Sequence, residues 1–241
     1  MTIQKHKIRF DIISIFPKMF EGYFSDSIIA RAQKKRLIDI RLHDLRRWTN
    51  DRHRTVDDKP FGGGPGMIMM IEPFYRAVRS LRLLRNKKTS DLKQKKSTNR
   101  VILMSAKGKR FTHKDAVRLA KYNRIVLLCG RYEGVDERVA RKICDEEISI
   151  GDYVLTGGEL AAMVVVDAVA RHLPGVLGKS ESLTQESHTE EGKTEYPQYT
   201  RPANFSPTDG KHWHTPSVLL SGDHKKIKAW RDQQTKTEDK N

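Results

Sequence analysis

One stretch of the sequence combines a short apolar strand, a glycine turn and the start of a helix, and it limits the chain to folds in which strands and helices alternate. Residues 147–150 form the apolar run, and the chain turns at Gly151. A second apolar run ends at Gly157 and Gly158, after which residues 159–173 are expected to be helical. Glycine lets backbone approach a ligand closely, and a helix N-terminus exposes N–H groups. The stretch therefore predicts either a binding loop for a small polar ligand or an ordinary strand-to-helix turn.

The same alternation runs through the chain before this stretch. Apolar runs predict strands at residues 8–16, 38–42, 101–104 and 125–129. Capping residues and apolar periodicity predict helices from Ser25 or Asp26 to Arg36, from Pro73, from Thr112 to Tyr122, and shortly after Asp136. Strands that alternate with helices predict an α/β fold, with a mostly parallel sheet and helices on both of its faces.

Three loops that contain glycine follow strands of this expected sheet, after Met104, Cys129 and Ile148. Open α/β sheets bind ligands at the carboxyl ends of their strands, so these loops are the expected pocket. The first strand ends without a glycine-rich turn, which argues against a Rossmann dinucleotide or methyltransferase site. The glycine-rich segment 61–66 lacks the Gly-Lys-Ser/Thr ending of a nucleotide P-loop.

The charge of the chain indicates the kind of partner. Lysine and arginine number 46 against 30 aspartates and glutamates, which gives a net charge of +16. A polyanionic partner is therefore expected, with nucleic acid favoured over an anionic membrane. The alternative is a chain that is basic without such a partner. The apolar run 160–170 is too short to span a bilayer. Two cysteines make neither a disulfide framework nor a zinc pattern, so a reducing cytoplasm is expected.

Composition also divides the chain into expected parts. Residues 1–177 form the α/β domain, 178–195 a flexible polar linker, and 196–241 a small basic α-helical domain with a helix from about Asp223 to Gln233. The long loop 49–66 is expected to be functional. The segment 85–99, rich in lysine, serine and threonine, is expected to be a surface insertion or, as an alternative, a nucleic-acid tail.

Several separated blocks of the sequence together resemble one family. The blocks, in order along the chain, are 51–58 with 61–70, 129–138, 149–160, 174–178, 199–202 and 218–231. They resemble the bacterial tRNA (guanine-N1)-methyltransferases of the trefoil-knot (SPOUT) class. The resemblance implies a deep knot in the first domain. It also implies a homodimer with each active site at the subunit interface.

The resemblance implies a bent S-adenosylmethionine molecule held by the three glycine loops. The implied cofactor residues are Ser105, Gly108, Gly130, Glu133, Ile150, Gly151, Asp152, Tyr153, Val154, Leu155, Gly157 and Gly158. The chain departs from the family pattern in the first loop, where Leu103, Ala106 and Lys107 stand in place of the common tyrosine, proline and glutamine.

The implied reaction methylates N1 of the guanosine immediately 3′ of the anticodon, position 37 of tRNA. This nitrogen carries a proton at neutral pH, so a base must remove it. The resemblance assigns the base to Glu186 in the linker, with His188 as the rival, and gives Arg171 a role near O6. An alternative role for Arg171 is an i,i+4 pair with Asp167 at a helix end.

The same reading expects the helical domain 196–241 to bind tRNA, and tRNA to contact Arg52, His53, Arg54 and Arg201. Two alternatives stay open from the residues. One is methylation of ribosomal RNA by a related knotted enzyme, and the other is an RNA-binding protein without catalysis. Binding of S-adenosylmethionine separates the second from the enzymes.

Overall fold

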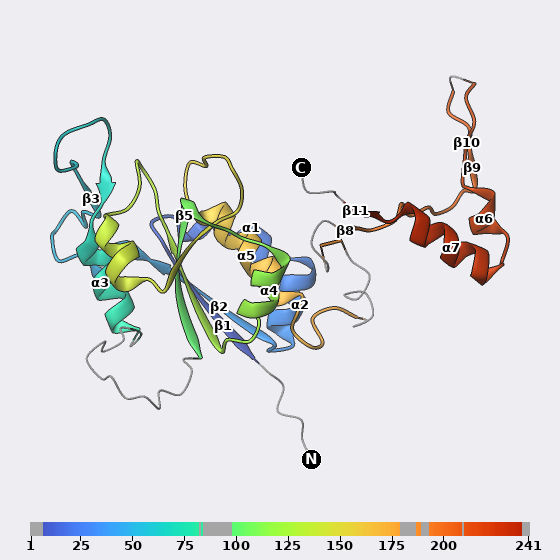
Figure 1. Ribbon diagram of the computed structural model, residues 1–241. Helices are drawn as coiled ribbons and strands as arrows, with labels where there is room; N and C mark the ends of the chain where they lie inside the picture. The colour runs from blue at the N-terminus through green and yellow to red at the C-terminus, as the bar shows by residue number, and fades with distance from the viewer. Residues whose placement is uncertain are drawn as a thin grey trace, which may run out of the picture. The chain divides into compact units, whose positions relative to one another are not determined.

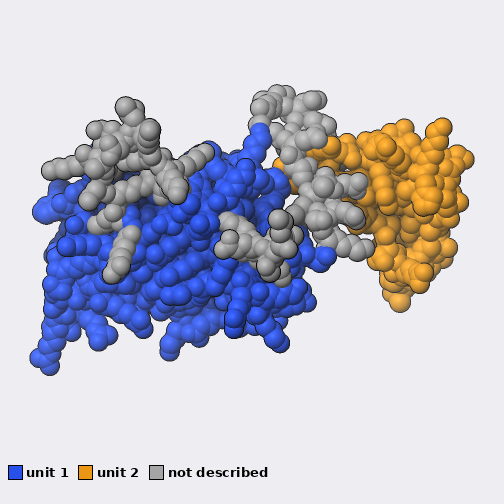
Figure 2. All heavy atoms as spheres, turned by 90° about the horizontal axis from the view of Figure 1, so that it is seen from below, with its two compact units in different colours: residues 1–179 blue, residues 180–241 orange. Residues whose placement is uncertain are grey.

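The chain divides into two compact units, residues 1–179 and residues 180–241, which are coloured separately in Figure 2. The computed structural model of the protein describes residues 7–81, 83, 98–178, 187–188, 193–208 and 210–237. Most of the segment expected at 85–99 lies outside the described residues. The strand β8 (Lys193–Thr194) falls in the expected linker, and it pairs with β11 (Lys236–Thr237) inside the second unit.

A five-stranded parallel sheet forms the centre of the first unit (Figure 1). Its strand order is β2-β1-β6-β5-β7. The strands are β1 (Ile8–Ser14), β2 (Ile38–Asp44), β5 (Asn99–Arg110), β6 (Arg124–Cys129) and β7 (Glu146–Ser149). A short pair, β3 (Asp57–Asp58) and β4 (Ile68–Met69), lies outside this sheet. The expected α/β fold with a parallel sheet is therefore confirmed.

Helices cover both faces of the sheet, as the strand patterns predict. Helical segments of the unit are η1 (Pro17–Phe20), α1 (Glu21–Phe24), α2 (Ser27–Lys34), η2 (Leu45–Trp48), α3 (Ile71–Ser80), α4 (His113–Leu119), η3 (Val139–Ile143) and α5 (Glu159–Ala170). Figure 1 shows α3 on one face and α1, α2, α4 and α5 on the other. Along β6, Ile125 and Leu127 pack in the core with α5, whereas Val126 and Leu128 pack in the core with α3. This alternation buries both faces, as parallel sheets require.

Local capping explains where several helices begin. Asp26 precedes α2, and its carboxylate accepts a hydrogen bond from the Ser27 N–H. Thr112 and Asp115 form the capping box that the sequence predicts for α4. The helical turn expected after Asp136 is η3, a π-helix, and the Asp136 carboxylate accepts from the Arg138 N–H at 2.9 Å.

The strand β5 is longer than the sequence predicts, because its second half pairs with β7 after a loop. Met104 and Lys109 both lie opposite Ile148, so residues 105–108 loop out of the sheet between two stretches of pairing. Beyond the loop, the Phe111 N–H donates to the Ser149 carbonyl at 2.8 Å. Residues on both sides of the loop therefore pair with β7, and this pairing holds the loop at both ends.

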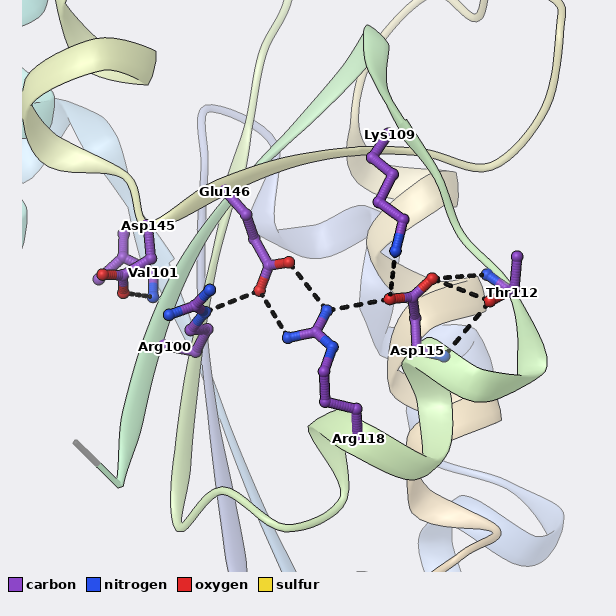
Figure 3. Close-up of polar contacts among 8 residues, drawn as sticks. All are labelled: Arg100, Val101, Lys109, Thr112, Asp115, Arg118, Asp145 and Glu146. Atoms are coloured by element: carbon purple, nitrogen blue, oxygen red, sulfur yellow. Dashed lines mark hydrogen bonds and ion pairs between the residues drawn. The ribbon is translucent and has the colours of Figure 1, made fainter. Parts of the chain in front are cut away.

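A network of ion pairs fixes this returning segment (Figure 3). The Arg118 guanidinium on α4 donates to both Glu146 oxygens at 2.8 and 3.2 Å and to Asp115 at 3.1 Å. Arg100 donates to Glu146 at 2.8 Å, and Lys109 to Asp115 at 3.1 Å. Burial opposes ionisation of Glu146, but hydrogen bonds from Arg118 and Arg100 outweigh it and lower its pKa. The network joins both ends of β5, α4 and β7.

A second buried network lies on the face of the sheet that α3 covers. The fully buried Asp11 carboxylate accepts from Arg9 at 2.7 Å and from Arg124 at 2.6 Å, and His43 Nε2 lies 2.7 Å away. Arg124 also donates to the Leu81 carbonyl after α3 at 3.0 Å. Burial opposes ionisation of Asp11, but hydrogen bonds from His43, Arg9 and Arg124 hold its pKa well below the usual value.

Replacing Asp11 with asparagine is expected to lower the free energy of unfolding by about 2 kcal/mol, because charged hydrogen bonds are lost in a buried site. The measurement is urea denaturation at neutral pH. Asp39→Asn is the matched control on the next strand, where Asp39 and Arg41 form a more exposed pair at 3.1 Å that is worth little. Equal midpoints for the two variants would contradict a stabilising role for the Asp11 network.

The second unit is small and has little interior. It contains β9 (Asn204–Phe205), β10 (Trp213–His214), α6 (Ser217–Leu220) and α7 (His224–Gln234) besides β8 and β11. The expected C-terminal helix is confirmed as α7. The Trp230 ring on α7 lies 6.3 Å from that of Tyr199, and Arg231 stacks over Tyr196 at 4.9 Å. No side chain described between residues 193 and 235 is fully buried, so aromatic contacts carry much of the packing.

Candidate functional site

A cavity of about 390 Å³ opens where β5 loops out and where β6 and β7 end. Three segments line it, from within 103–107, 130–140 and 148–161. These are the loops after Met104, Cys129 and Ile148, so the structure brings together the three glycine-bearing loops. The volume falls within the range of small-molecule sites in proteins.

Most of the cofactor residues that the resemblance implies lie on this cavity. Those on the lining are Ser105, Gly130, Glu133, Ile150, Gly151, Tyr153, Val154, Leu155, Gly157 and Gly158. Gly108 and Asp152 are not on the lining. Gly108 instead packs against the backbone of β7, and the Asp152 carboxylate lies 3.8 Å from Arg110.

Two of the lining glycines allow direct contact between the second and third loops. The Gly158 N–H donates to the Gly130 carbonyl at 2.9 Å. A Cβ atom on Gly158 would lie 2.9 Å from the Cys129 Cα, and one on Gly130 would lie 2.9 Å from a Val135 methyl carbon. Both positions leave room for backbone alone, so the start of α5 is held directly against the end of β6.

A buried ion pair that sequence reasoning missed joins the same two loops. The Arg131 Nε donates to Glu159 at 2.9 Å, and Arg131 Nη1 donates to the Thr156 carbonyl at 3.2 Å. Glu159 is only 1% exposed, and its other oxygen accepts from the Ser14 hydroxyl at 2.6 Å. A Cβ atom on Gly157 would lie 2.3 Å from the Arg131 Nε. Gly157 therefore makes room for this pair, whatever it also does for a ligand.

The sequence held a signal for this pair. A single carboxylate, Glu159, opens a run that is otherwise apolar for seven residues, and Arg131 directly follows the glycine of the neighbouring loop. A charge at a predicted helix start can also be an ordinary favourable contact with the helix dipole. Its pairing across loops depends on the fold, which local patterns do not contain.

Lys107, one of the residues by which the first loop departs from the family pattern, has an acidic partner on the lining of the cavity. The Lys107 ammonium group forms an ion pair with Glu137, and Glu137 also accepts from Arg141 Nε at 2.9 Å. The Glu137 carboxylate raises the pKa of Lys107. Both Lys107 and Glu137 line the cavity, so the additional charge is neutralised where it arises.

Of the two expected catalytic residues, the structure describes Arg171 alone. Arg171 follows the last residue of α5 and is half-buried. The 12-residue helix separates it from Gly158 at the cavity, about 20 Å along the helix axis. Glu186 lies outside the described residues. Its neighbour His188 is exposed, and the His188 N–H donates to the Lys193 carbonyl at 2.7 Å.

The loop expected to contact tRNA is closed by its own hydrogen bonds. The Asp51 carboxylate accepts from the Thr55 N–H at 3.0 Å and from the Thr55 hydroxyl at 2.7 Å. Arg52, His53 and Arg54 are exposed on this closed turn. Within the described residues, neither arginine forms an ion pair. Arg201 is exposed in the second unit.

Replacing Arg52 and Arg54 with alanine is expected to weaken tRNA binding and to reduce its salt dependence. The log–log slope against salt should fall by roughly one unit for each lost phosphate contact. Binding is measured over a series of salt concentrations, with Arg36→Ala, which is on another exposed turn, as the control. A slope equal to that of the unaltered protein would remove this turn from the RNA interface.

Fold and cavity together define an α/β protein with a small-molecule site built from glycine loops at strand ends. The family model described as tRNA (Guanine-1)-methyltransferase TrmD matches residues 8–241. The chain belongs to this family, whose members transfer a methyl group to tRNA, and it is an enzyme.

Similar proteins cover nearly the whole chain. A tRNA (guanine-N(1)-)-methyltransferase of Dictyoglomus turgidum is 51% identical over 93% of this chain and 83% of its own length. One of Thermomicrobium roseum is 50% identical over 93% of this chain and 77% of its own length. One of Ruminiclostridium cellulolyticum is 46% identical over 97% of this chain and 94% of its own length. In the described part of the chain, no helix is long and apolar enough to cross a membrane.

Proposed function

We propose that the protein methylates N1 of the guanosine immediately 3′ of the anticodon, position 37 of tRNA, with S-adenosylmethionine as the methyl donor. The observation that carries this proposal is the cavity at the strand ends, on which ten of the twelve residues expected to bind the donor lie together. Family membership over residues 8–241 supports the tRNA substrate. The net charge of +16 supports binding of a polyanion, and a cytoplasmic location follows from the substrate.

The lining of the cavity fits such a donor. Ile150 and Leu155 supply apolar surface for a purine, and the glycines bring backbone N–H and carbonyl groups within reach of its polar edge. The Glu133 carboxylate and the rings of Tyr132 and Tyr153 offer a favourable environment for a sulfonium cation. When bound, the donor supplies a methyl group that is activated by positively charged sulfur.

The reaction needs the N1 proton to leave. We assign its removal to Glu186, as the resemblance implies, with the proton passing from N1 to the carboxylate. With the donor bound, the freed N1 electron pair would take the methyl carbon, and the electrons of the carbon–sulfur bond would remain on sulfur. The Arg171 guanidinium stabilises the negative charge that develops on O6 as the proton departs.

The position of Arg171 supports an active site that a second copy of the chain completes. An arginine side chain cannot span the roughly 20 Å that separate Arg171 from the cavity along α5. An apolar face offers a surface for that copy: Phe16, Met19 and Tyr23 are exposed in or beside η1 and α1, and Leu160 and Val164 are exposed on α5, against which η1 packs. The Tyr23 hydroxyl bonds to Asp167, which holds α1 against α5. We propose a homodimer that joins through this apolar face, with each active site formed by both subunits.

We also propose that the strand ends are threaded as a trefoil knot. The return of β5 to Ile148 after the 105–108 loop supports this proposal, because Gly108 approaches the backbone of β7 closely there. Knots are rare among protein folds, and an ordinary open sheet would not need such a close return.

The test is a methylation assay with two tRNA transcripts that differ only in guanosine or adenosine at position 37. Methylation at N1 of the guanosine transcript alone is expected. Equal methylation of a ribosomal RNA fragment would favour the rival substrate, and RNA binding without donor binding would favour a non-catalytic protein. Sedimentation of the free protein measures the oligomeric state separately, and a monomer would exclude the shared active site.

A further inference from the structure

A β-hairpin in the second unit projects from its two helices (Figure 1). It consists of β9 and β10, which pair antiparallel with Phe205 opposite Trp213 and Asn204 opposite His214. All four of these side chains are exposed, Phe205 by 49% and Trp213 by 59%. Two large aromatic rings are therefore in water on an element that none of the described residues covers.

The two faces of the hairpin differ in chemistry. The Phe205 and Trp213 rings lie 5.6 Å apart on one face. Alternation along the strands places His212 and His214 on the other face, where their rings stack at 6.2 Å. There His214 Nδ1 lies 2.8 Å from Asn204 Oδ1. The hairpin thus presents an apolar aromatic platform and, behind it, a face that can exchange hydrogen bonds.

An isolated two-stranded hairpin is marginally stable in water, and this one buries neither of its faces. Aromatic rings bury more surface than other side chains when they are covered, so covering this pair would stabilise the hairpin most. The exposed aromatic pair therefore indicates a partner that covers this face of the hairpin.

The charge of the segment that carries the hairpin indicates which partner. Residues 196–241 contain eight lysines and arginines against five aspartates and glutamates. Exposed cations of this segment include Arg201, Lys211, Lys225, Lys226, Lys228 and Arg231. A cationic segment that also displays aromatic rings fits single-stranded nucleic acid, in which phosphates meet the cations and bases stack on the rings.

We propose that the β9–β10 hairpin is a base-stacking element that docks on unpaired nucleotides of the substrate tRNA. An unpaired base stacks on the Trp213 and Phe205 platform. On the opposite face, the imidazoles and the Asn204 amide can bond to base edges or ribose hydroxyls of neighbouring nucleotides. The proposal rests on the proposed function, since it takes tRNA as the RNA that the enzyme binds.

The experiment compares Trp213→Ala, Phe205→Ala and Trp213→Tyr in the full-length chain. Binding is measured by fluorescence anisotropy with substrate tRNA and with an RNA duplex of equal length that has no unpaired nucleotides. Trp213→Ala is expected to weaken tRNA binding about tenfold, because stacking one base is worth that much. Its salt slope should not change, since no phosphate contact is lost. Trp213→Tyr should restore most of the affinity, and duplex binding should be unaffected.

The matched control is Leu220→Ala, which removes a side chain of the same unit that is also 59% exposed but not aromatic. Unchanged tRNA affinity in both Trp213→Ala and Phe205→Ala would overturn the proposal, as would an equal loss for the duplex. A changed oligomeric state with intact RNA affinity would make the hairpin a protein contact and would also overturn it. Methylation by the unaltered protein is assayed separately, so failure of the hairpin and failure of the proposed function are distinct results.

Discussion

Replacing Gly108 with alanine is expected to lower the free energy of unfolding by about 3 kcal/mol or more, because the new methyl group overlaps backbone. A Cβ atom at this position would lie 2.6 Å from the Ile148 nitrogen and 2.7 Å from the Glu147 carbonyl carbon. Neither atom can move without shifting β7, the strand that pairs with β5 on both sides of the loop. The strand also carries Glu146, which is bound by two arginines, so the surrounding structure resists such a shift.

The measurement is urea denaturation of the full-length chain. Gly22→Ala is the matched control, because a Cβ atom on Gly22 would meet nothing within 4 Å and the residue lies in α1. Alanine is the better helix former, so this control should be neutral or slightly stabilising. If Gly108→Ala were as stable as Gly22→Ala, the close approach of Gly108 to β7 would not exist in solution.

This close approach also shows why part of the fold could not be predicted from the sequence. The strand pattern before the loop was readable, since residues 101–104 are a continuous apolar run. The second half of β5 contains lysine, glycine and arginine, and nothing local in it indicates a strand. It becomes one because its partner β7, which follows it by some forty residues in sequence, lies alongside. Local propensity cannot report a pairing that the topology imposes.

The capping signals were easier to read because their physics is local. Thr112 and Asp115 satisfy the first N–H groups of α4 from within the same turn, and Asp26 does the same for α2. Asp136 was less informative, since it bonds to the Arg138 N–H before a helix with π-type geometry.

The cavity could be predicted in part for a similar reason. Glycine loops at strand ends mark a binding edge, and the three loops do meet there. The roles of single glycines could not be separated. Gly108 lets β5 approach the backbone of β7, while Gly157 leaves space for the pair of Arg131 and Glu159. Both roles require φ/ψ freedom or the absence of a side chain, so the sequence looks alike for both.

Glu186 is the residue whose replacement is expected to affect the reaction most. Its carboxyl has a reference pKa of about 4.3, so it is ionised at neutral pH but is a weak base. As the proposed base, it would act on an N1 proton that Arg171 makes more acidic, or its pKa would rise when the site closes. The residues that follow it are anchored, because the Ser187 hydroxyl accepts from the Glu195 N–H at 2.9 Å and the His188 N–H is bonded to Lys193. Such anchors would limit the positions that the base can adopt.

Glu186→Gln keeps the size of the side chain and removes its basicity. Single-turnover methylation is expected to slow by roughly 10²-fold or more, because general base catalysis contributes about that much. Affinity for S-adenosylmethionine, measured by calorimetry without RNA, should stay the same, since the cavity is lined by residues 103–161. His188→Ala is the matched variant two residues away, and its rate should stay near normal. A slow His188→Ala beside a near-normal Glu186→Gln would move the base to the histidine.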